Sequence, residues 1–428
     1  MNKEQMLDLL RKNVIPALGC TEPVTIALAA ADAAKAAGGE VKNVEMSLSR
    51  NMYKNGMSVG IAGFDKVGLE YAAALGALIA DTSAQLEIMD MITPEIAAKA
   101  SALAENGSIK ITVDEDARGI YAKAIVRTTE GEGLSIIKNG HVNIILTQKN
   151  GETIFSAEEK TVSSAPSPLE SLLKMSFKDI RTLACSASED ELAFLMDGVV
   201  MNQRLADYIV NGEGPGIGLG AALKKDLPDM MGSGLIPRVL LRVASATEAR
   251  LDGCPYSTMS SAGSGSKGIA TILPTAMTAQ ELGKSHLETL HALAFAHLIN
   301  EYINASVGKL SAVCACAMAS ATASAAAITH LMGGTDEQIG FAVRNMTGTI
   351  SGMVCDGGKV GCALKLSNAV AAAFTSAILA MNQVGLRPTD GICGSTPEAC
   401  IANMGRLSSR GMGDTDREIL AIMLEKNC

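Results

Sequence analysis

The hydrophobic and polar positions divide the chain into a mixed front part and a helical back part. Residues 23–39 and 69–86 are Ala- and Leu-rich stretches with helical texture. Between them, residues 41–49 form a short β-like segment that ends in a polar run. From 107 to 160 the pattern changes to short alternating runs separated by Gly and Asn, namely SIKITVDE, IYAKAIVRTT, GHVNIILTQK and ETIFSAEE. This alternation predicts an antiparallel β segment.

The segment SSAPSPLES, residues 163–171, is typical of a linker or a domain edge. From there to Cys428, nearly every stretch has helical texture, rich in Ala, Leu and Met with Gly breaks. We therefore predict an α+β fold in three parts. These are a mixed helix and strand part over 1–105, an antiparallel β segment over 106–165, and a large, mostly α-helical part over 166–428.

Composition narrows the possible partners and the compartment. The chain has 428 residues, of which 48% are hydrophobic, so it can bury one large or two ordinary cores. A net charge of −9, scattered Lys and Arg, and 3% aromatic residues without Trp argue against nucleic acid as a partner. The N-terminal residues 1–19 mix charged and apolar positions as an amphipathic helix does, unlike a signal peptide, so we expect a cytoplasmic protein.

Residues 310–332 carry no formal charge and are long enough to cross a bilayer. Their content is mostly Ala, Ser, Thr and Cys, which transfer weakly into lipid, and no Trp or Tyr anchors stand at the edges. The stretch therefore favours a helix buried inside the protein over a membrane span, and we expect no membrane partner.

Three familiar kinds of site are not favoured. The Gly-rich segment 212–220 follows a helix-like stretch instead of a strand, so a helix junction is favoured over a phosphate loop. His297 and His330 lie among apolar helical neighbours, which is typical of packed core histidines and not of a base. No zinc motif and no signal for pyridoxal phosphate is present.

The chain has ten cysteines, which do not indicate a disulfide framework in a compartment that keeps thiols reduced, so we expect some of them to bind metal or react. Cys314 and Cys316 form one pair in AVCACAMAS, and Cys355 and Cys362 form another in VCDGGKVGC, whose glycines give the backbone freedom to turn toward sulfur. Spacing alone leaves metal binding and buried packing equally open. The other cysteines singled out are predicted to be structural, namely Cys185, Cys254, Cys393 and Cys400.

Several motifs together resemble the L-cysteine desulfidase family, which is related to the iron–sulfur L-serine dehydratases. They are ALGCTEP, SRNMYKNGMSVGIAG, SAGSGSKGIATILP, GKLSAVCACA and GMVCDGGKVGCALKLS. A weaker likeness to the serine dehydratase catalytic domain covers residues 333–356. The likeness runs over almost the whole chain.

This resemblance implies a [4Fe–4S] cluster held by three cysteines in the helical part, with one iron open to the substrate. Cys355 and Cys362 correspond to two of the ligands, and the third is Cys314 or Cys316. In the related serine dehydratases a C-terminal cysteine can occupy the open iron, which makes Cys428 a candidate cap.

α,β-Elimination also needs a base near Cα and groups that hold a zwitterion. Cys20, beside a helix start, is our candidate base, because helix N–H groups lower a thiol pKa; a buried structural Cys or a cluster ligand are the alternatives. Two polar groups are candidates for binding the substrate. One is a carboxylate cradle at a helix start, Ser264, Ser266 and Lys267, and the other is a polar cluster at a strand end, Arg50, Asn51, Lys54 and Asn55. For the second group, an exposed turn remains equally open.

The expected function is therefore elimination of L-cysteine to pyruvate, ammonia and hydrogen sulfide. One alternative is the same scaffold acting on L-serine or another small β-substituted amino acid. The other is a non-enzymatic protein that binds a cluster or carries sulfur. The Ala- and Met-rich helices also make a homodimer reasonable.

Overall fold

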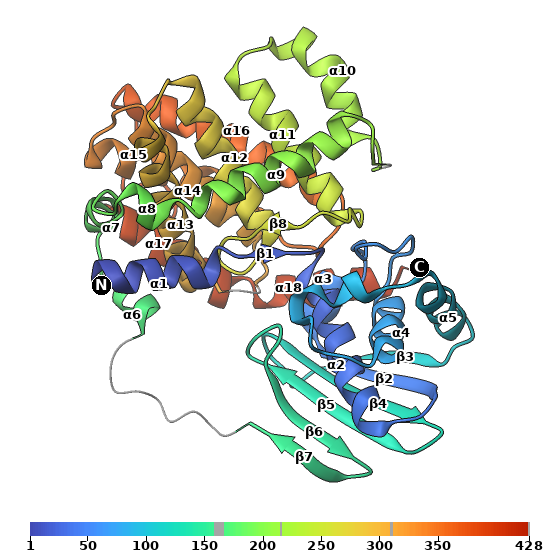
Figure 1. Cartoon of the computed structure of the whole chain (residues 1–428). Helices are drawn as coiled ribbons and strands as arrows, with labels where there is room; N and C mark the ends of the chain where they lie inside the picture. The colour runs from blue at the N-terminus through green and yellow to red at the C-terminus, as the bar shows by residue number, and fades with distance from the viewer. Residues whose placement is uncertain (158–166, 215, 309–310, 427–428) are drawn as a thin grey trace.

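A six-stranded sheet forms the lower part of the molecule in Figure 1. The computed structural model describes residues 1–157, 167–214, 216–308 and 311–426. The strand order is β3-β2-β4-β5-β6-β7. The strands are β2 (Val41–Ser49), β3 (Ile109–Asp114), β4 (Tyr121–Thr128), β5 (Glu132–Lys138), β6 (Ile144–Lys149) and β7 (Glu152–Ser156). The alternation predicted for this region is confirmed in β4, where Ala122, Ala124 and Val126 face the core.

One pairing in this sheet differs from the prediction. The run over 108–115 was expected to be antiparallel, but β3 lies parallel to β2. The reason is the connection, because the helices between the two strands return the chain to the same end of the sheet before β3 begins. These elements are α3 (Arg50–Gly56), α4 (Leu69–Ile79), the 3₁₀ helix η1 (Gln85–Met91) and α5 (Pro94–Glu105).

The helix α2 (Thr21–Ala37) packs between this sheet and α4 and is buried along most of its length. Its small side chains let the neighbouring backbone approach closely. At Gly76 in α4, a Cβ atom would lie 2.0 Å from the carbonyl oxygen of Ala27. The Ala-rich composition of residues 23–39 is therefore a packing requirement, and α2, α4 and the sheet share one hydrophobic core.

The rest of the chain is helical, as predicted, and packs around α14 (Ala315–Leu331). Its helices up to α13 are α6 (Pro168–Leu172), α7 (Phe177–Ala184), α8 (Glu189–Leu192), α9 (Leu195–Val210), α10 (Leu219–Met231), α11 (Leu235–Leu251), α12 (Gly265–Glu281) and α13 (His286–Val307). After α14 come α15 (Asp336–Ile350), α16 (Cys362–Met381), α17 (Pro397–Arg406), the π-helix η2 (Leu407–Gly411) and α18 (Gly413–Leu424). The N-terminal helix α1 (Lys3–Asn13) also belongs to this second core.

The two cores do not follow the predicted division strictly along the sequence. Strands on both sides of residue 105 belong to one sheet, and α1 packs against α6 and α13 of the helical part. The three-part division therefore stays a prediction. The predicted linker over 163–171 lies partly outside the described residues, and Pro168, within it, already begins α6.

The uncharged stretch over 310–332 forms the buried helix α14, as predicted, although Leu310 lies outside the described residues. Among the described helices, α16 has the length and apolar composition to cross a membrane. It packs against α11, α14 and α15, and core helices of soluble proteins meet the same criteria.

The Gly-rich segment joins α9 to α10, which confirms the predicted helix junction. Its backbone N–H groups already have an anionic partner inside the protein. The buried carboxylate of Glu248 accepts hydrogen bonds of 2.7 to 3.0 Å from residues 217 to 220. The loop thus resembles an anion cradle whose anion is a side chain of α11.

Candidate active site and metal centre

Two of the sequence motifs are brought together by a short antiparallel ladder between β1 (Pro16–Ala17) and β8 (Thr258–Met259). Pro16 pairs with Met259, and Ala17 pairs with Thr258. Shortly after these strands, Cys20 stands at the N-cap position of α2 and Ser264 at that of α12. The ladder therefore places the Cys20 motif beside the Ser264 motif at the seam between the two cores.

A second bridge joins the two cysteine pairs of the helical part. Val313 and Val354 form an antiparallel bridge. The N–H of Cys314 donates to the carbonyl of Met353 at 2.8 Å, and the N–H of Cys355 donates to the carbonyl of Ala312 at 2.7 Å. Segments that are about forty positions apart in the sequence thus lie directly against each other, as a shared cluster requires.

The glycines of VCDGGKVGC let this loop pack on α3. Gly357 has φ +91, and a Cβ atom there would lie 2.2 Å from the carbonyl oxygen of Lys54. The N–H of Gly358 donates to the carbonyl of Asn55 at 3.2 Å. The Asn55 carbonyl therefore holds the loop by a hydrogen bond, the Lys54 carbonyl packs closely on Gly357, and α16 begins at Cys362 just beyond the loop.

Five thiols surround one cavity of about 80 Å³, which we call the thiol cavity; they belong to Cys20, Cys314, Cys316, Cys355 and Cys362. An adjoining cavity of about 190 Å³, the side cavity, shares three of these cysteines and opens toward His141 and Lys267. Cys314 belongs to the second core and Cys316 and Cys355 pack against it, whereas Cys20, at the start of α2, and Cys362, at the start of α16, meet in a small cluster with Val59 and Leu251. The cavity is thus built by both parts of the molecule.

Four helices begin at the thiol cavity. Cys20 is the N-cap of α2, Ser264 is the N-cap of α12, Cys314 is the N-cap of α14, and Cys362 is the first residue of α16. None of these four N-termini has a side-chain cap. In α16 the first three N–H groups already donate to the backbone carbonyls of residues 359 to 361, so the first N–H groups left for another partner are those of α2, α12 and α14. Helix N-termini carry partial positive charge, and four of them around one cavity favour a bound anion.

Buried cations add to this positive potential. Arg250 is 3% exposed, donates to the Ser266 hydroxyl at 2.8 Å and lies 3.8 Å from the Cys20 sulfur, while its Nε has no hydrogen-bond partner. Lys267 is 4% exposed and donates to the carbonyl of Ala262 at 3.2 Å. Among the described residues, no carboxylate forms an ion pair with either side chain. Buried cations of this kind need a negative partner, and thiolates with a bound cluster would supply it.

Without a bound metal, the ionised forms of Cys314, Cys316 and Cys362 are disfavoured by burial and by the negative charge of neighbouring thiols. Burial, followed by the negative charges of Cys316, Cys355 and Cys362, raises the pKa of Cys314 well above its ordinary value. Burial also raises the pKa of Cys316 and of Cys362. Metal binding replaces these protons, so the donor set fits a metal centre that takes up several thiolates at once.

Within the described residues, no group of three or more His, Cys, Asp or Glu side chains surrounds a point where one metal ion would bind. A cubane cluster asks for a different arrangement, because each cysteine binds a separate iron. Thiols that line a cavity, as here, fit a cluster better than they fit a single zinc ion.

The surroundings of Cys20 contradict the expectation that its thiol pKa is lowered. The predicted helix start is present, but burial raises the pKa of the Cys20 thiol to about 12, and the neighbouring charge of Glu22 adds to this effect. The positive charge of Arg250 acts in the opposite direction and is too small to compensate. The idea that helix N–H groups lower this pKa is therefore wrong, because burial of the thiol outweighs the helix dipole.

Two further charged or titratable groups at the cavities did not emerge from the sequence. Glu22 is buried and accepts hydrogen bonds from Asn55 at 3.2 Å and from the Cys20 thiol at 3.5 Å. Burial alone would raise the pKa of Glu22, but the charges of His141 and Arg250 and the hydrogen bond from Asn55 help to lower it. Glu22 stands inside ALGCTEP, so that motif could have indicated it. His141 reaches the side cavity from the turn between β5 and β6, where no pattern marks it.

The structure divides the predicted substrate-binding residues. Ser264, Ser266 and Lys267 lie at the start of α12 and line the thiol cavity or the side cavity, as does Asn55. Ser264 Oγ is 3.8 Å from the Cys316 sulfur. Arg50 and Asn51 line a different cavity, and Lys54 lines none of these three.

The expected strand end at 50–56 is the helix α3, in which Lys54 is 1% exposed and forms an ion pair with Asp416 of α18. The polar cluster does follow the end of β2, as predicted, but it forms a helix with buried residues, so the alternative of an exposed turn is wrong. The serine hydroxyl that caps α3, at position 49, accepts from the Met52 N–H and starts the helix directly after β2.

The remaining cysteines lie away from the thiol cavity. Cys393 and Cys400 are buried under α15 and α17, Cys254 is buried, and Cys185 is half-buried. His297 is buried and contacts the Ser261 hydroxyl, and His330 stacks edge-on against Phe295, in line with packed core histidines. Cys428 lies outside the described residues, so its suggested role as a cap stays a prediction.

Comparison with known proteins supports the same chemistry at the level of a family. Residues 82–421 match the family described as serine dehydratase alpha chain. A UPF0597 protein from Clostridium tetani is 35% identical over 427 residues, covering 100% of both chains. UPF0597 proteins from Caldanaerobacter subterraneus subsp. tengcongensis and Shewanella pealeana are each 37% identical, covering at least 98% of both chains. These names state no activity. The chain belongs to the serine dehydratase alpha chain family.

Proposed function

We propose that this protein is an iron–sulfur lyase that eliminates the thiol group of L-cysteine. The family supports dehydratase-like chemistry, in which a β-substituent leaves an amino acid. The observation that carries the proposal is the thiol cavity together with the adjoining side cavity. Five thiols, four helix N-termini without a side-chain cap and the buried Arg250 meet at the thiol cavity, and the buried Lys267 lines the side cavity. We also propose a cytoplasmic location, because cluster ligands must stay reduced.

We propose Cys355, Cys362 and Cys314 as the cluster ligands. The three approach one another through the bridge at Val313 and Val354 and through the start of α16. Cys316 differs from Cys314 in its neighbours, since it lies near Lys267 and the Ser264 hydroxyl. This position suits a residue that faces the substrate instead of the cluster.

A cluster bound by three thiolates would supply a Lewis-acidic iron that assists departure of the substrate's heteroatom. The start of α12 would bind the substrate carboxylate through its N–H groups, the Ser264 hydroxyl and the Lys267 ammonium. Glu22 and the Asn55 amide oxygen would accept hydrogen bonds from the substrate ammonium. The substrate Cα would then lie between the two cavities, which share Cys314, Cys316 and Cys355.

Cys20 remains our proposed base for the Cα proton. Its neighbour Arg250, 3.8 Å from the Cys20 sulfur, favours the thiolate. Burial and the hydrogen bond that the thiol donates to Glu22 at 3.5 Å favour the protonated form, so the base must lose its proton to solvent before it acts. Removal of the Cα proton and departure of sulfide leave aminoacrylate, which tautomerises to an imine and hydrolyses in water to pyruvate and ammonia. Each turnover therefore releases one sulfide, one ammonia and one pyruvate.

The test is an anaerobic count of iron and acid-labile sulfide, followed by a turnover assay, on matched Cys→Ser variants. Each of the variants Cys314→Ser, Cys355→Ser and Cys362→Ser should lose cluster binding. Ser at 316 should retain the cluster and weaken turnover, and Ser at 20 should retain the cluster and lose turnover. Cys185→Ser, outside the cavity, serves as the control and should resemble the wild type. Failure of the wild type to take up a cluster when supplied with iron and sulfide would refute the proposal.

L-Serine is the second candidate substrate, and the description of the matched family favours it. With serine, iron would assist departure of a hydroxyl group instead of a thiol. Comparing sulfide release from cysteine with pyruvate release from both substrates, at equal concentration, separates the two. A cluster spectrum without pyruvate from either substrate would instead support a non-enzymatic cluster-binding protein.

A further inference from the structure

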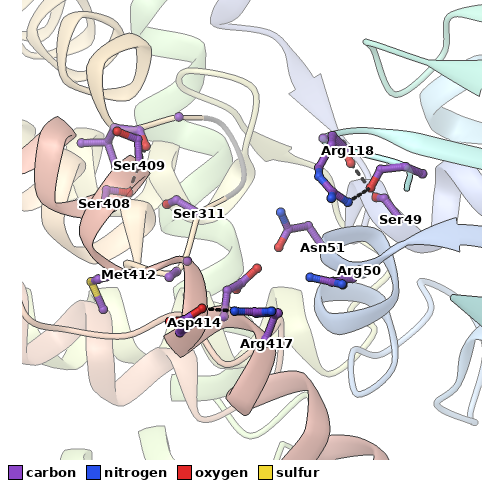
Figure 2. Close-up of a pocket in the computed structure, with 17 residues that line it drawn as sticks. Ser49, Arg50, Asn51, Arg118, Ser311, Ser408, Ser409, Met412, Asp414 and Arg417 are labelled. Atoms are coloured by element: carbon purple, nitrogen blue, oxygen red, sulfur yellow. Dashed lines mark hydrogen bonds and ion pairs between the residues drawn. The ribbon is translucent and has the colours of Figure 1, made fainter. Parts of the chain in front are cut away.

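A separate cavity of about 600 Å³ lies between α3, η2 and the start of α18 (Figure 2). We call it the arginine cavity, because three arginines from three different segments line it, namely Arg50, Arg118 and Arg417. Serine hydroxyls and the backbone around Gly413 complete its wall. Neither the proposed elimination nor the match to the family assigns it a role.

Two of the three arginines in this cavity form ion pairs with carboxylates, and the third does not within the described residues. Arg50 pairs with Glu115, and Arg417 pairs with Asp414. Arg118 donates only to the backbone carbonyls of Glu115 and Ala117, and no carboxylate pairs with it among the described residues. Its planar guanidinium therefore has N–H groups left over, in a geometry that suits a carboxylate or a phosphate.

A helix N-terminus reinforces the same preference from the opposite wall. The helix α18 begins at Gly413, its N-cap is Met412, and no side chain caps it. Both residues line the arginine cavity, so the first N–H groups of α18 are close to it. Ser409, on η2, adds a hydroxyl that no described residue uses in a hydrogen bond. A cation, free N–H groups and a hydroxyl around one hollow favour an oxyanion.

The arginine cavity is connected to the thiol cavity by two short segments. The helix α3 presents Arg50 and Asn51 to the first cavity and, about one turn later, Asn55 to the second. Ser311 lines the arginine cavity and the side cavity, and Cys314 follows three residues later. Each segment is thus a direct covalent connection between the walls of the two cavities.

A buried ion pair makes this connection stiff. Lys54, in the middle of this path, pairs with Asp416 of α18. A ligand that draws α18 toward Arg118 would therefore pull on α3, whose last carbonyl groups contact the Gly357 loop.

We propose that the arginine cavity binds a small oxyanion, a carboxylate or phosphate group, and that its occupancy is transmitted through α3 to the thiol cavity. Arg118 and the N-terminus of α18 hold the anion. The proposal does not depend on the reaction at the thiol cavity, because its ligand and its contacts are different.

The first experiment measures binding by calorimetry, with inorganic phosphate, pyruvate and succinate as probes and sodium chloride at matched ionic strength as the reference. The variant is Arg118→Gln, and the control is Arg238→Gln, a surface arginine of α11 that pairs with Glu281. We expect saturable binding of a carboxylate or of phosphate, weakened about tenfold or more by Arg118→Gln and unchanged by the control. Phosphate binding alone, or carboxylate binding alone, identifies the kind of oxyanion.

The second experiment measures how fast a thiol reagent reacts with the metal-free protein, with and without the anion that binds. We expect the rate to change at least twofold in the wild type and in Arg238→Gln, and not in Arg118→Gln. Absence of saturable binding, binding that chloride matches, or binding that survives Arg118→Gln overturns the site. A rate that is unaffected by a bound anion overturns the transmission. None of these readouts depends on elimination activity.

Discussion

Gly357 offers the sharpest test of how the cysteine loop is held. Substitution with Ala would place a Cβ atom 2.2 Å from the Lys54 carbonyl oxygen and 3.2 Å from its carbon. Both atoms belong to the backbone of α3, so no side chain can rotate away. The residue also has φ +91, a conformation that L side chains rarely adopt.

Two costs add up in Gly357→Ala. The positive φ costs about 1–2 kcal/mol, and forcing an extra methyl group into a packed contact costs roughly 1–3 kcal/mol. The expected loss is therefore about 2–5 kcal/mol. For a unit the size of the helical part, each kcal/mol lowers the melting temperature by roughly 2–4 °C, so a fall of several degrees is expected.

Gly352→Ala is the matched control, because Gly352 is exposed, precedes the same cysteines and has no atom within 4 Å of an added Cβ. It should leave the melting temperature unchanged or raise it slightly. The assay is thermal unfolding of both variants, together with their iron content after anaerobic reconstitution. Equal melting temperatures in Gly357→Ala and the wild type, or equal losses in the two variants, would refute the close packing of the loop on α3.

Three further predictions concern stability. Lys54→Met should lower the free energy of unfolding by about 3–5 kcal/mol, because it leaves the Asp416 charge without its buried partner, and adding Asp416→Leu should recover part of the loss in a denaturant titration. Burial lowers the pKa of His297 to about 3, so as the pH falls below about 6.5 this histidine takes up a proton in the unfolded chain before it does so in the folded protein. The free energy of unfolding should therefore fall by ~1.4 kcal/mol per pH unit between about pH 6.5 and pH 3. Melting curves of His297→Asn should show a weaker pH dependence over that range. Gly76→Ala should lower the melting temperature by several degrees, because its Cβ would lie 2.0 Å from the Ala27 carbonyl oxygen, and an unchanged value would contradict the packing of α2 on α4.

Much of the fold could be predicted from local sequence patterns. The Ala-rich stretch after Cys20 forms α2, and the glycine and serine run at 261–268 leads into α12, because helix starts depend on nearby residues. The parallel pairing of β3 could not be predicted, since it depends on where the four intervening helical elements return the chain. The helix α3 was missed because a seven-residue polar segment has no periodicity to detect, and its ion pair with Asp416 involves a residue 362 positions away.

Part of the candidate site could also be predicted from the sequence, and part could not. Spacing and glycine content singled out the cysteine pairs and the Ser264 motif, the family resemblance implied their link to a cluster, and the structure brings them to one seam. Arg250 was not found, because it stands in an ordinary helical stretch, and only the packing of α11 brings it within 3.8 Å of the Cys20 sulfur. The sign of the Cys20 pKa shift was missed for the same reason, since burial depends on the whole fold.

The position of α1 has a consequence for how the protein is made. Its apolar residues, among them Met6 and Leu10, are buried against helices that the ribosome adds only much later, including α13. The sheet and α2 are contiguous in the chain and can assemble as soon as β7 has emerged. At a synthesis rate of roughly 5–20 residues per second, the apolar face of α1 then stays exposed for on the order of tens of seconds before α13 is available to cover it. The apolar face of α1 therefore stays exposed while the helices that cover it are synthesised, and chaperones that bind exposed apolar helices would have a target there.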